Sequence, residues 1–208
     1  MIMVFKQQWF RLLAFTVCIL LFSLFIQHPL PLRFISFLCI FIVAYIFSTE
    51  QRFITMITGE KSSRSVIAIW TVIAVCGSFL LAMESREDAS LPLLPVSLSW
   101  FTIIAMAIGS MEELLFRGWM FSQFNGGWRW PAVVFTSLAH AAYKALLFTS
   151  GYLPYEVNTW DLFLVTFEAG IFLGLTRLFS RSVWPALIAH AIFDLLIYGD
   201  QAVPWWIF

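Results

Sequence analysis

The chain has 208 residues, of which 61% are hydrophobic and only 12% are charged. Soluble domains carry about 25% charged residues, so this composition excludes an ordinary soluble protein and indicates an integral membrane protein. The formal net charge is zero, and without a basic excess we expect no nucleic-acid partner.

Seven apolar segments that are long enough to cross a bilayer, or nearly so, follow one another along the chain. They comprise residues 12–26, 34–47, 66–83, 98–116, 131–148, 162–179 and 184–198. A membrane span usually needs about 20 residues, so the short second and seventh segments are expected to be tilted, re-entrant or extended through their flanks. The sequence therefore predicts an all-α, polytopic transmembrane helical bundle of about seven spans (six to eight), with residues 1–208 forming a single integral membrane domain.

The lysines and arginines between these segments predict the orientation of the chain. Only Arg33 and Arg86 fall on one side, whereas nine fall on the side that holds the N-terminus: Lys6, Arg11, Arg52, Lys61, Arg64, Arg117, Arg129, Arg177 and Arg181. Cytoplasmic loops hold the excess of positive charge, so we expect a cytoplasmic N-terminus. The first apolar segment lacks a small-residue cleavage site and is read as a retained span. The absence of a targeting extension favours a prokaryotic plasma membrane.

A small set of ionisable residues lies inside the apolar segments. A charge at the centre of a span costs at least ~2.5 to 3.5 kcal/mol, so such residues usually face a partner or a water-filled cavity. With ~1.5 Å per helical residue, five of them lie ~8 to ~15 Å from the cytoplasmic ends of four segments. These five are Glu112, His140, Glu168, His190 and Asp194. Four helices thus place ionisable groups in one layer, where we expect a functional site.

Two pairs of polar residues have the spacing of one helical turn. Glu113 and Arg117 are an i, i+4 pair, so Arg117 can neutralise Glu113 while Glu112, about 100° around the helix, faces the bundle. His190 and Asp194 share a helix face in the same way, so this carboxylate can orient the imidazole. A purely structural ion pair would explain Glu113 well but Glu112 poorly.

One glutamate together with two histidines supports the activation of water. A glutamate held in a low dielectric is an effective general base, and an imidazole can accept a proton from water or donate to an oxyanion. Water activation for hydrolysis is the resulting prediction. A zinc-dependent membrane protease is the alternative, because two histidines and a glutamate can hold a catalytic zinc ion, although no HExxH motif is present.

Three motifs lie in successive predicted spans: EExxxR from Glu112, a mid-span His140, and HxxxD from His190. In this order they resemble the CPBP family of CAAX-protease-like intramembrane endopeptidases, also called Abi proteins. The resemblance covers residues 98–199, which we expect to form the catalytic core. It implies a glutamate-dependent peptidase inside a helical bundle that uses no metal ion or other cofactor.

The resemblance also implies a role for each residue of these motifs. Glu112 and His140 would activate water, and His190 with residue 194 would stabilise the oxyanion. The implied catalytic set is Glu112, His140, His190 and Asp194, supported by Glu113 and Arg117. Asp194 stands where the family usually has Asn, so it could donate to an oxyanion only when protonated and would otherwise orient His190.

Three further residues near these motifs have open interpretations. Thr136 occupies the position four before His140 where the family usually has Phe. Glu168 belongs to no motif, and is either a hydrogen-bonded interhelical carboxyl or a supporting group or substrate contact at the site. Lys144, one turn from His140, is expected to be a partner for one of the carboxylates.

The sequence thus predicts an intramembrane endopeptidase that hydrolyses a peptide bond of a membrane-associated, lipidated or C-terminally sorted protein or peptide. One alternative is a catalytically silent membrane scaffold that regulates a partner protein. Another is a proton-coupled carrier, but such proteins usually show paired broken helices and an internal repeat, and neither is evident.

Overall fold

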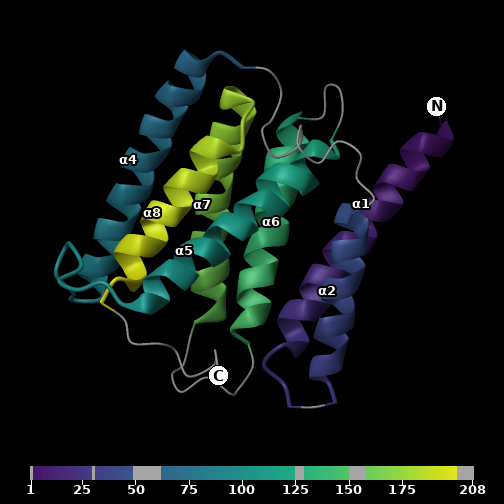
Figure 1. Cartoon of the computed structure of the whole chain (residues 1–208), viewed down its shortest axis with the longest axis horizontal. Helices are drawn as coiled ribbons and strands as arrows, with labels where there is room; N and C mark the ends of the chain where they lie inside the picture. The colour runs from purple at the N-terminus through teal and green to yellow at the C-terminus, as the bar shows by residue number, and fades with distance from the viewer. Residues whose placement is uncertain (1, 30, 49–61, 125–128, 150–157, 201–208) are drawn as a thin grey trace. The chain divides into compact units, whose positions relative to one another are not determined.

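The computed structural model describes residues 2–29, 31–48, 62–124, 129–149 and 158–200. Every regular element in this part of the chain is a helix (Figure 1). The α-helices are α1 (Ile2–Phe25), α2 (Arg33–Ser48), α4 (Arg64–Asp88), α5 (Trp100–Glu113), α6 (Arg129–Leu147), α7 (Thr159–Ser180) and α8 (Trp184–Tyr198), and a π-helix, η1 (Leu114–Met120), follows α5 directly. Each predicted apolar segment overlaps one α-helix, which confirms the all-α prediction.

Three helices have the length and hydropathy of a membrane span: residues 8–25 of α1, all of α4, and α7. The 25 residues of α4 extend about 37 Å, which exceeds the ~30 Å hydrocarbon core of a bilayer. The apolar helices α2 and α8 are shorter, and the 15 residues of α8 extend only about 22 Å. The chain is therefore an all-helical integral membrane protein.

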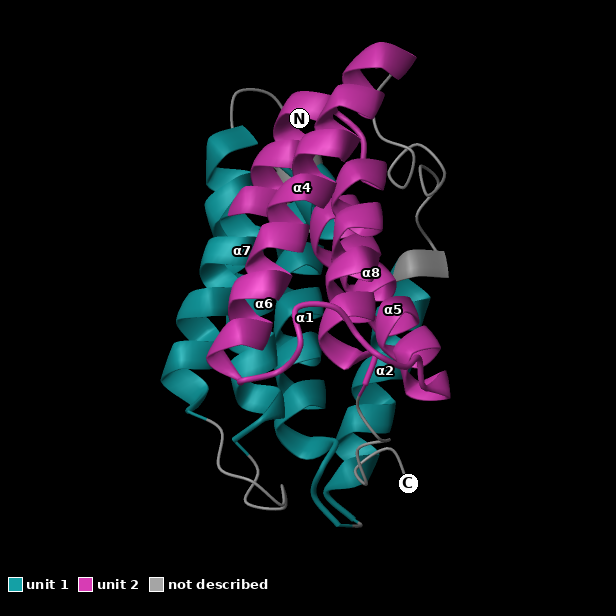
Figure 2. Ribbon diagram, turned by 90° about the vertical axis from the view of Figure 1, so that its left-hand side faces the viewer, with its two compact units in different colours: residues 1–54, 120–171 teal, residues 55–119, 172–208 magenta. Residues whose placement is uncertain are grey.

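The chain folds into two compact units, each built from two separate stretches (Figure 2). Unit 1 comprises residues 1–54 and 120–171, and unit 2 comprises residues 55–119 and 172–208. Two of the three unit boundaries fall inside η1 and α7, and the third lies outside the described residues. The predicted catalytic core, residues 98–199, draws on both units, and a single domain over the whole chain stays a prediction.

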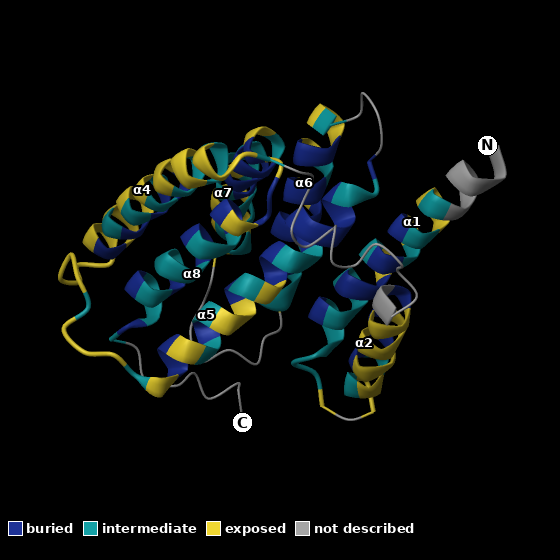
Figure 3. Ribbon diagram, turned by 45° about the horizontal axis from the view of Figure 1, so that its top comes forward, coloured by how far each residue is buried: buried dark blue, intermediate teal, exposed yellow. Residues whose placement is uncertain are grey.

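Unit 1 is organised around the packing of α1 on α2 and α6. The buried side of α1 repeats every three or four residues, as one face of an α-helix does; it consists of Leu12, Phe15, Cys18 and Ile19. Arg11 Nη2 donates a hydrogen bond to the carbonyl of Ile46, 2.9 Å away, in the last turn of α2. The opposite side of α2 exposes aromatic and aliphatic residues (Figure 3), as expected of a face towards lipid.

Unit 2 is organised around α8, which contacts both α4 and α5. Small residues allow close approach of helices in a membrane, and the core of this unit contains Ala74, Ala186 and Ala189 beside Leu173. Pro185 suits the start of α8, because proline fixes a helical φ at a position whose N–H needs no partner. This packing sets α8 and its polar side chains against α5.

Arg86 and Asp200 join three segments at one end of unit 2. Arg86 is buried and donates to the carbonyls of Pro92 at 2.6 Å and Leu196 at 2.7 Å, as well as to Asp200 Oδ2 at 2.5 Å. The other oxygen of Asp200 accepts hydrogen bonds from the backbone N–H groups of Val96 and Ser97. The Arg86 hydrogen bond holds the pKa of Asp200 below its usual range, with further lowering by these N–H groups. The ends of α4 and α8 are thereby tied to the segment that leads into α5.

Candidate active site

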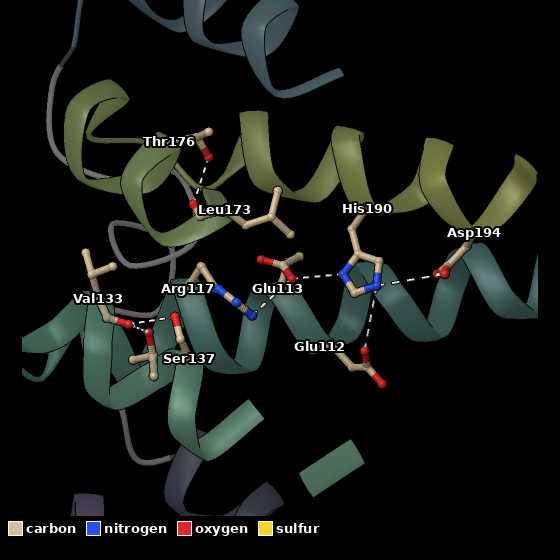
Figure 4. A network of polar contacts seen from close by, with 10 residues as sticks. Glu112, Glu113, Arg117, Val133, Ser137, Leu173, Thr176, His190 and Asp194 are labelled. Carbon is tan, nitrogen blue, oxygen red and sulfur yellow. Dashed lines mark hydrogen bonds and ion pairs between the residues drawn. The ribbon is translucent and has the colours of Figure 1, made fainter. Parts of the chain in front are cut away.

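Two adjacent glutamates end α5, and the chain continues directly into η1 (Figure 4). Glu112 is 2% exposed and Glu113 is fully buried. A π-helix has i→i+5 hydrogen bonds and is rare, but it occurs frequently at functional sites. The sequence predicted an ordinary α-helix over 98–116. The seven residues of η1 are too few for their side-chain pattern to distinguish the period of a π-helix from that of an α-helix.

Glu113 contacts two partners through one carboxylate oxygen. Its Oε1 accepts a hydrogen bond from Arg117 Nη1 at 3.1 Å, so the expected i, i+4 pair is present. The same oxygen lies 2.8 Å from His190 Nδ1 on α8. Glu113 therefore does more than pair with Arg117, because it also fixes the orientation of an imidazole from another helix.

His190 turns its second nitrogen towards two further carboxylates. Its Nε2 lies 3.8 Å from Glu112 Oε2 and 3.8 Å from Asp194 Oδ1. Both distances are longer than a hydrogen bond, so the carboxylate that orients His190 is Glu113 rather than Asp194. We refer to Glu112, Glu113, His190 and Asp194 as the Glu–His cluster. All four residues lie in unit 2 and are at most 9% exposed.

The close spacing of these groups links their protonation states. Two unit charges 4 Å apart interact by about 4 kcal/mol at an effective dielectric of about 20. Three carboxylates lie within 3.8 Å of one imidazole, so a proton gained or lost by one member changes the proton affinity of the others. The arrangement is suited to moving a proton in a site that excludes most water.

Gly109 provides the space that this arrangement needs. A Cβ atom at Gly109 would collide with Asp194 Oδ2 and would lie 2.9 Å from His190 Cδ2. Only a glycine therefore allows α5 and α8 to approach closely here. Our sequence reasoning missed this residue, although a glycine one turn before Glu113 in an apolar helix is a recognisable sign of close approach.

His140 lies on α6 in unit 1 and is 3% exposed. Its ring stacks on Tyr143 with centroids 6.2 Å apart, and Lys144 Nζ lies 5.9 Å from the same Tyr143 ring. The cooperation of His140 with Glu112 stays a prediction. Glu168, on the part of α7 that belongs to unit 1, is exposed.

The position four before this histidine also has a defined environment in unit 1. Thr136 is fully buried, and its hydroxyl donates to the carbonyl of Val133 at 3.4 Å. Phe135, the neighbouring aromatic residue, instead packs on Phe124 with ring centroids 5.5 Å apart. Phe135 is thus engaged by a different part of unit 1 and does not take the position of Thr136.

Among the residues that the structure describes, no group of three or more His, Cys, Asp or Glu side chains is arranged to hold a metal ion. In the Glu–His cluster, one nitrogen of His190 is already hydrogen-bonded to Glu113. Zinc chemistry therefore stays the alternative, to be tested directly with a chelator.

Comparison with known proteins assigns part of the chain to a family. A family model described as type II CAAX prenyl endopeptidase Rce1-like matches residues 94–196. No curated protein and no solved structure matches the chain. The matched segment contains the whole Glu–His cluster as well as Arg117 and His140. Through residues 94–196, the chain belongs to the CAAX protease (CPBP) family that its three motifs predict.

Proposed function

We propose that this protein is a glutamate-dependent intramembrane endopeptidase that hydrolyses a peptide bond of a membrane-associated or lipidated protein or peptide. The observation that carries the proposal is the buried Glu–His cluster within the segment matched by the CAAX protease family. Family membership supports a membrane hydrolase that acts on peptide bonds, and the cluster suggests which groups perform the chemistry.

In the proposed reaction, Glu112 removes a proton from a water molecule, whose oxygen attacks the carbonyl carbon of the scissile peptide bond. The carbonyl oxygen becomes a tetrahedral oxyanion. His190 carries a proton on each nitrogen, donates Nδ1–H to Glu113, and directs Nε2–H to the oxyanion. As the C–N bond breaks, the proton on Glu112 passes to the leaving amine, and the carboxylate is regenerated.

The remaining motif residues assist this reaction in our proposal. Arg117 keeps Glu113 ionised, so that Glu113 holds the imidazolium in place. Asp194, when protonated, supplies a second donor near His190 Nε2. His140 would help Glu112 to position the water, which requires that it reach Glu112 during the reaction. No metal ion takes part in this scheme.

The orientation of the chain completes the proposal. We propose a prokaryotic plasma membrane as the location and place the N-terminus on its cytoplasmic side, because nine lysines and arginines lie on that side of the predicted spans. Arg117 and Arg177 are buried in the helices, so the other seven of the nine carry this argument. The two charges on the other side both have partners within the chain: Arg33 donates to the carbonyl of His28 at 3.1 Å, and Arg86 is buried in the network with Asp200. Their side chains are held at helix ends by these bonds.

The decisive experiment uses the purified full-length protein in lipid vesicles and a quenched fluorescent peptide that ends in a prenylated CAAX sequence. An unprenylated copy of the peptide tests whether the lipid is required. We expect cleavage by the wild type, and loss of at least about 100-fold in Glu112→Ala and His190→Ala, which is the scale of general acid–base catalysis. Glu84→Ala removes an exposed carboxylate of α4 and serves as the matched control.

Three outcomes would change the proposal. Cleavage that survives Glu112→Ala removes the glutamate mechanism. Activity that a chelator abolishes and zinc restores replaces it with a zinc-dependent protease. A cellular phenotype that persists in both variants indicates a scaffold that regulates a partner protein.

A further inference from the structure

Arg177 is a buried cation next to the Glu–His cluster that the proposed reaction does not use. The sequence placed it among the cytoplasmic loop charges, but the structure shows it in the last turn of α7 with only 6% of its surface exposed. Burial of a charge costs several kcal/mol unless partners compensate. Its position in unit 2 therefore needs a structural reason.

The main-chain carbonyl of Arg117 is one partner of Arg177. Arg177 Nε donates to this carbonyl at 3.1 Å, and the bond is buried. Arg117 lies within η1, and this bond brings the guanidinium of Arg177 from α7 to the backbone of the π-helix. Arg177 thus supports the π-helix from a neighbouring helix.

The chain of contacts continues from this carbonyl to the imidazole. The side chain of Arg117 holds Glu113 at 3.1 Å, and Glu113 holds His190 at 2.8 Å. Each bond fixes the next group, so a shift in the backbone of η1 would be transmitted to the ring that faces Glu112. Arg177 is the outermost member of this series.

The positive charge of Arg177 has a second effect, on the charge balance of the buried group. The Glu–His cluster holds three carboxylates, and Arg117 with the doubly protonated imidazole supplies two positive charges. Arg177 adds a third positive charge, so the buried group is neutral when Asp194 is ionised and carries one positive charge when Asp194 is protonated. In either state, loss of Arg177 makes the group more negative by one charge, which favours protonation of a carboxylate.

We infer that Arg177 is a positioning residue of the proposed peptidase, which holds the π-helix through the Arg117 carbonyl and balances the charge of the Glu–His cluster. This inference rests on the proposed function. Replacement by lysine keeps the charge but loses the planar guanidinium bond, whereas replacement by glutamine removes the charge. The two variants therefore separate the two effects.

The test compares the full-length wild type, Arg177→Lys and Arg177→Gln in vesicles, with the prenylated CAAX peptide as the probe. A hydrogen bond to a charged group contributes about 1.5–3 kcal/mol, so we expect kcat to fall about 10- to 150-fold in Arg177→Gln with KM unchanged. The acid limb of its pH–kcat profile should also move to higher pH. Arg177→Lys should lower kcat but keep the wild-type pH limb. Arg181→Gln, at an exposed site one turn away, is the matched control.

A second measurement does not depend on catalysis. The chain has three histidines, so nitrogen-15 histidine spectra report the titration of His190, assigned by its absence in His190→Gln. We expect Arg177→Gln to shift the His190 titration and to leave His28 unchanged. A wild-type His190 titration in Arg177→Gln overturns the inference, as do wild-type kcat and pH limb. Absence of Glu112-dependent cleavage in the wild type refutes the proposed function instead, and the spectra then still decide the role of Arg177.

Discussion

Substitution of Gly109 by alanine tests the close approach of α5 and α8 most directly. The added methyl group would collide with the Asp194 carboxylate and meet His190 at 2.9 Å from Cδ2 and 3.1 Å from Nε2. Overpacking costs about 1–3 kcal/mol, but alanine also favours a helix interior by about 1 kcal/mol over glycine. The net loss of stability should therefore be between about zero and 2 kcal/mol.

The effect on catalysis should be larger, because the groups that must move are those proposed to react. If the full packing cost falls on the transition state, kcat decreases about 5- to 160-fold. Steady-state cleavage of the prenylated peptide gives kcat, and thermal unfolding in detergent gives the stability. Gly77→Ala is the matched control, since its Cβ would collide with the Phe172 ring in the same unit but outside the Glu–His cluster. It should lower stability and leave kcat unchanged.

A double-mutant cycle locates the effect. Asp194→Ala removes the carboxylate that the new methyl group would strike. Gly109→Ala should therefore lower the thermal stability less in the Asp194→Ala background than in the wild type. Equal costs in both backgrounds would show that Asp194 does not contact Gly109. Wild-type kcat and stability in Gly109→Ala itself would refute the helix approach described above.

Two further predictions concern the ion pairs. Glu113→Gln keeps the size of the side chain but removes the charge that holds Arg117 and His190, so kcat should fall at least about 10-fold; a variant as active as the wild type would contradict the role of Glu113. The hydrogen bond from Arg86 is the main cause of the lowered pKa of Asp200. The ionised Asp200 therefore stabilises the folded protein fully above about pH 4. This contribution is lost as the pH falls through the folded-state pKa. Asp200→Asn should therefore melt below the wild type at pH 7, and this difference should disappear in acid; a constant difference from pH 7 to pH 2 would contradict the ion pair.

The helices themselves could be predicted from the sequence, because membrane burial requires long apolar runs and satisfied backbone hydrogen bonds. Their ends were less accurate. The first apolar segment was predicted to begin at residue 12, but α1 begins at Ile2, since backbone hydrogen bonds continue through polar residues such as Lys6 that hydropathy excludes. The π-helix was not predicted, because helical period is poorly defined over seven residues.

The sequence by itself determined the membrane class and the family, because these depend on composition and on the order and spacing of motifs along the chain. It also indicated the candidate site residues, whose catalytic roles stay predictions. Contacts between helices were decided only by the tertiary structure. The orientation of His190 by Glu113 joins residues 77 positions apart, and the Arg177 bond to Arg117 spans 60. Helix packing, rather than chain distance, brings such groups together, and the close approach at Gly109 arises in the same way.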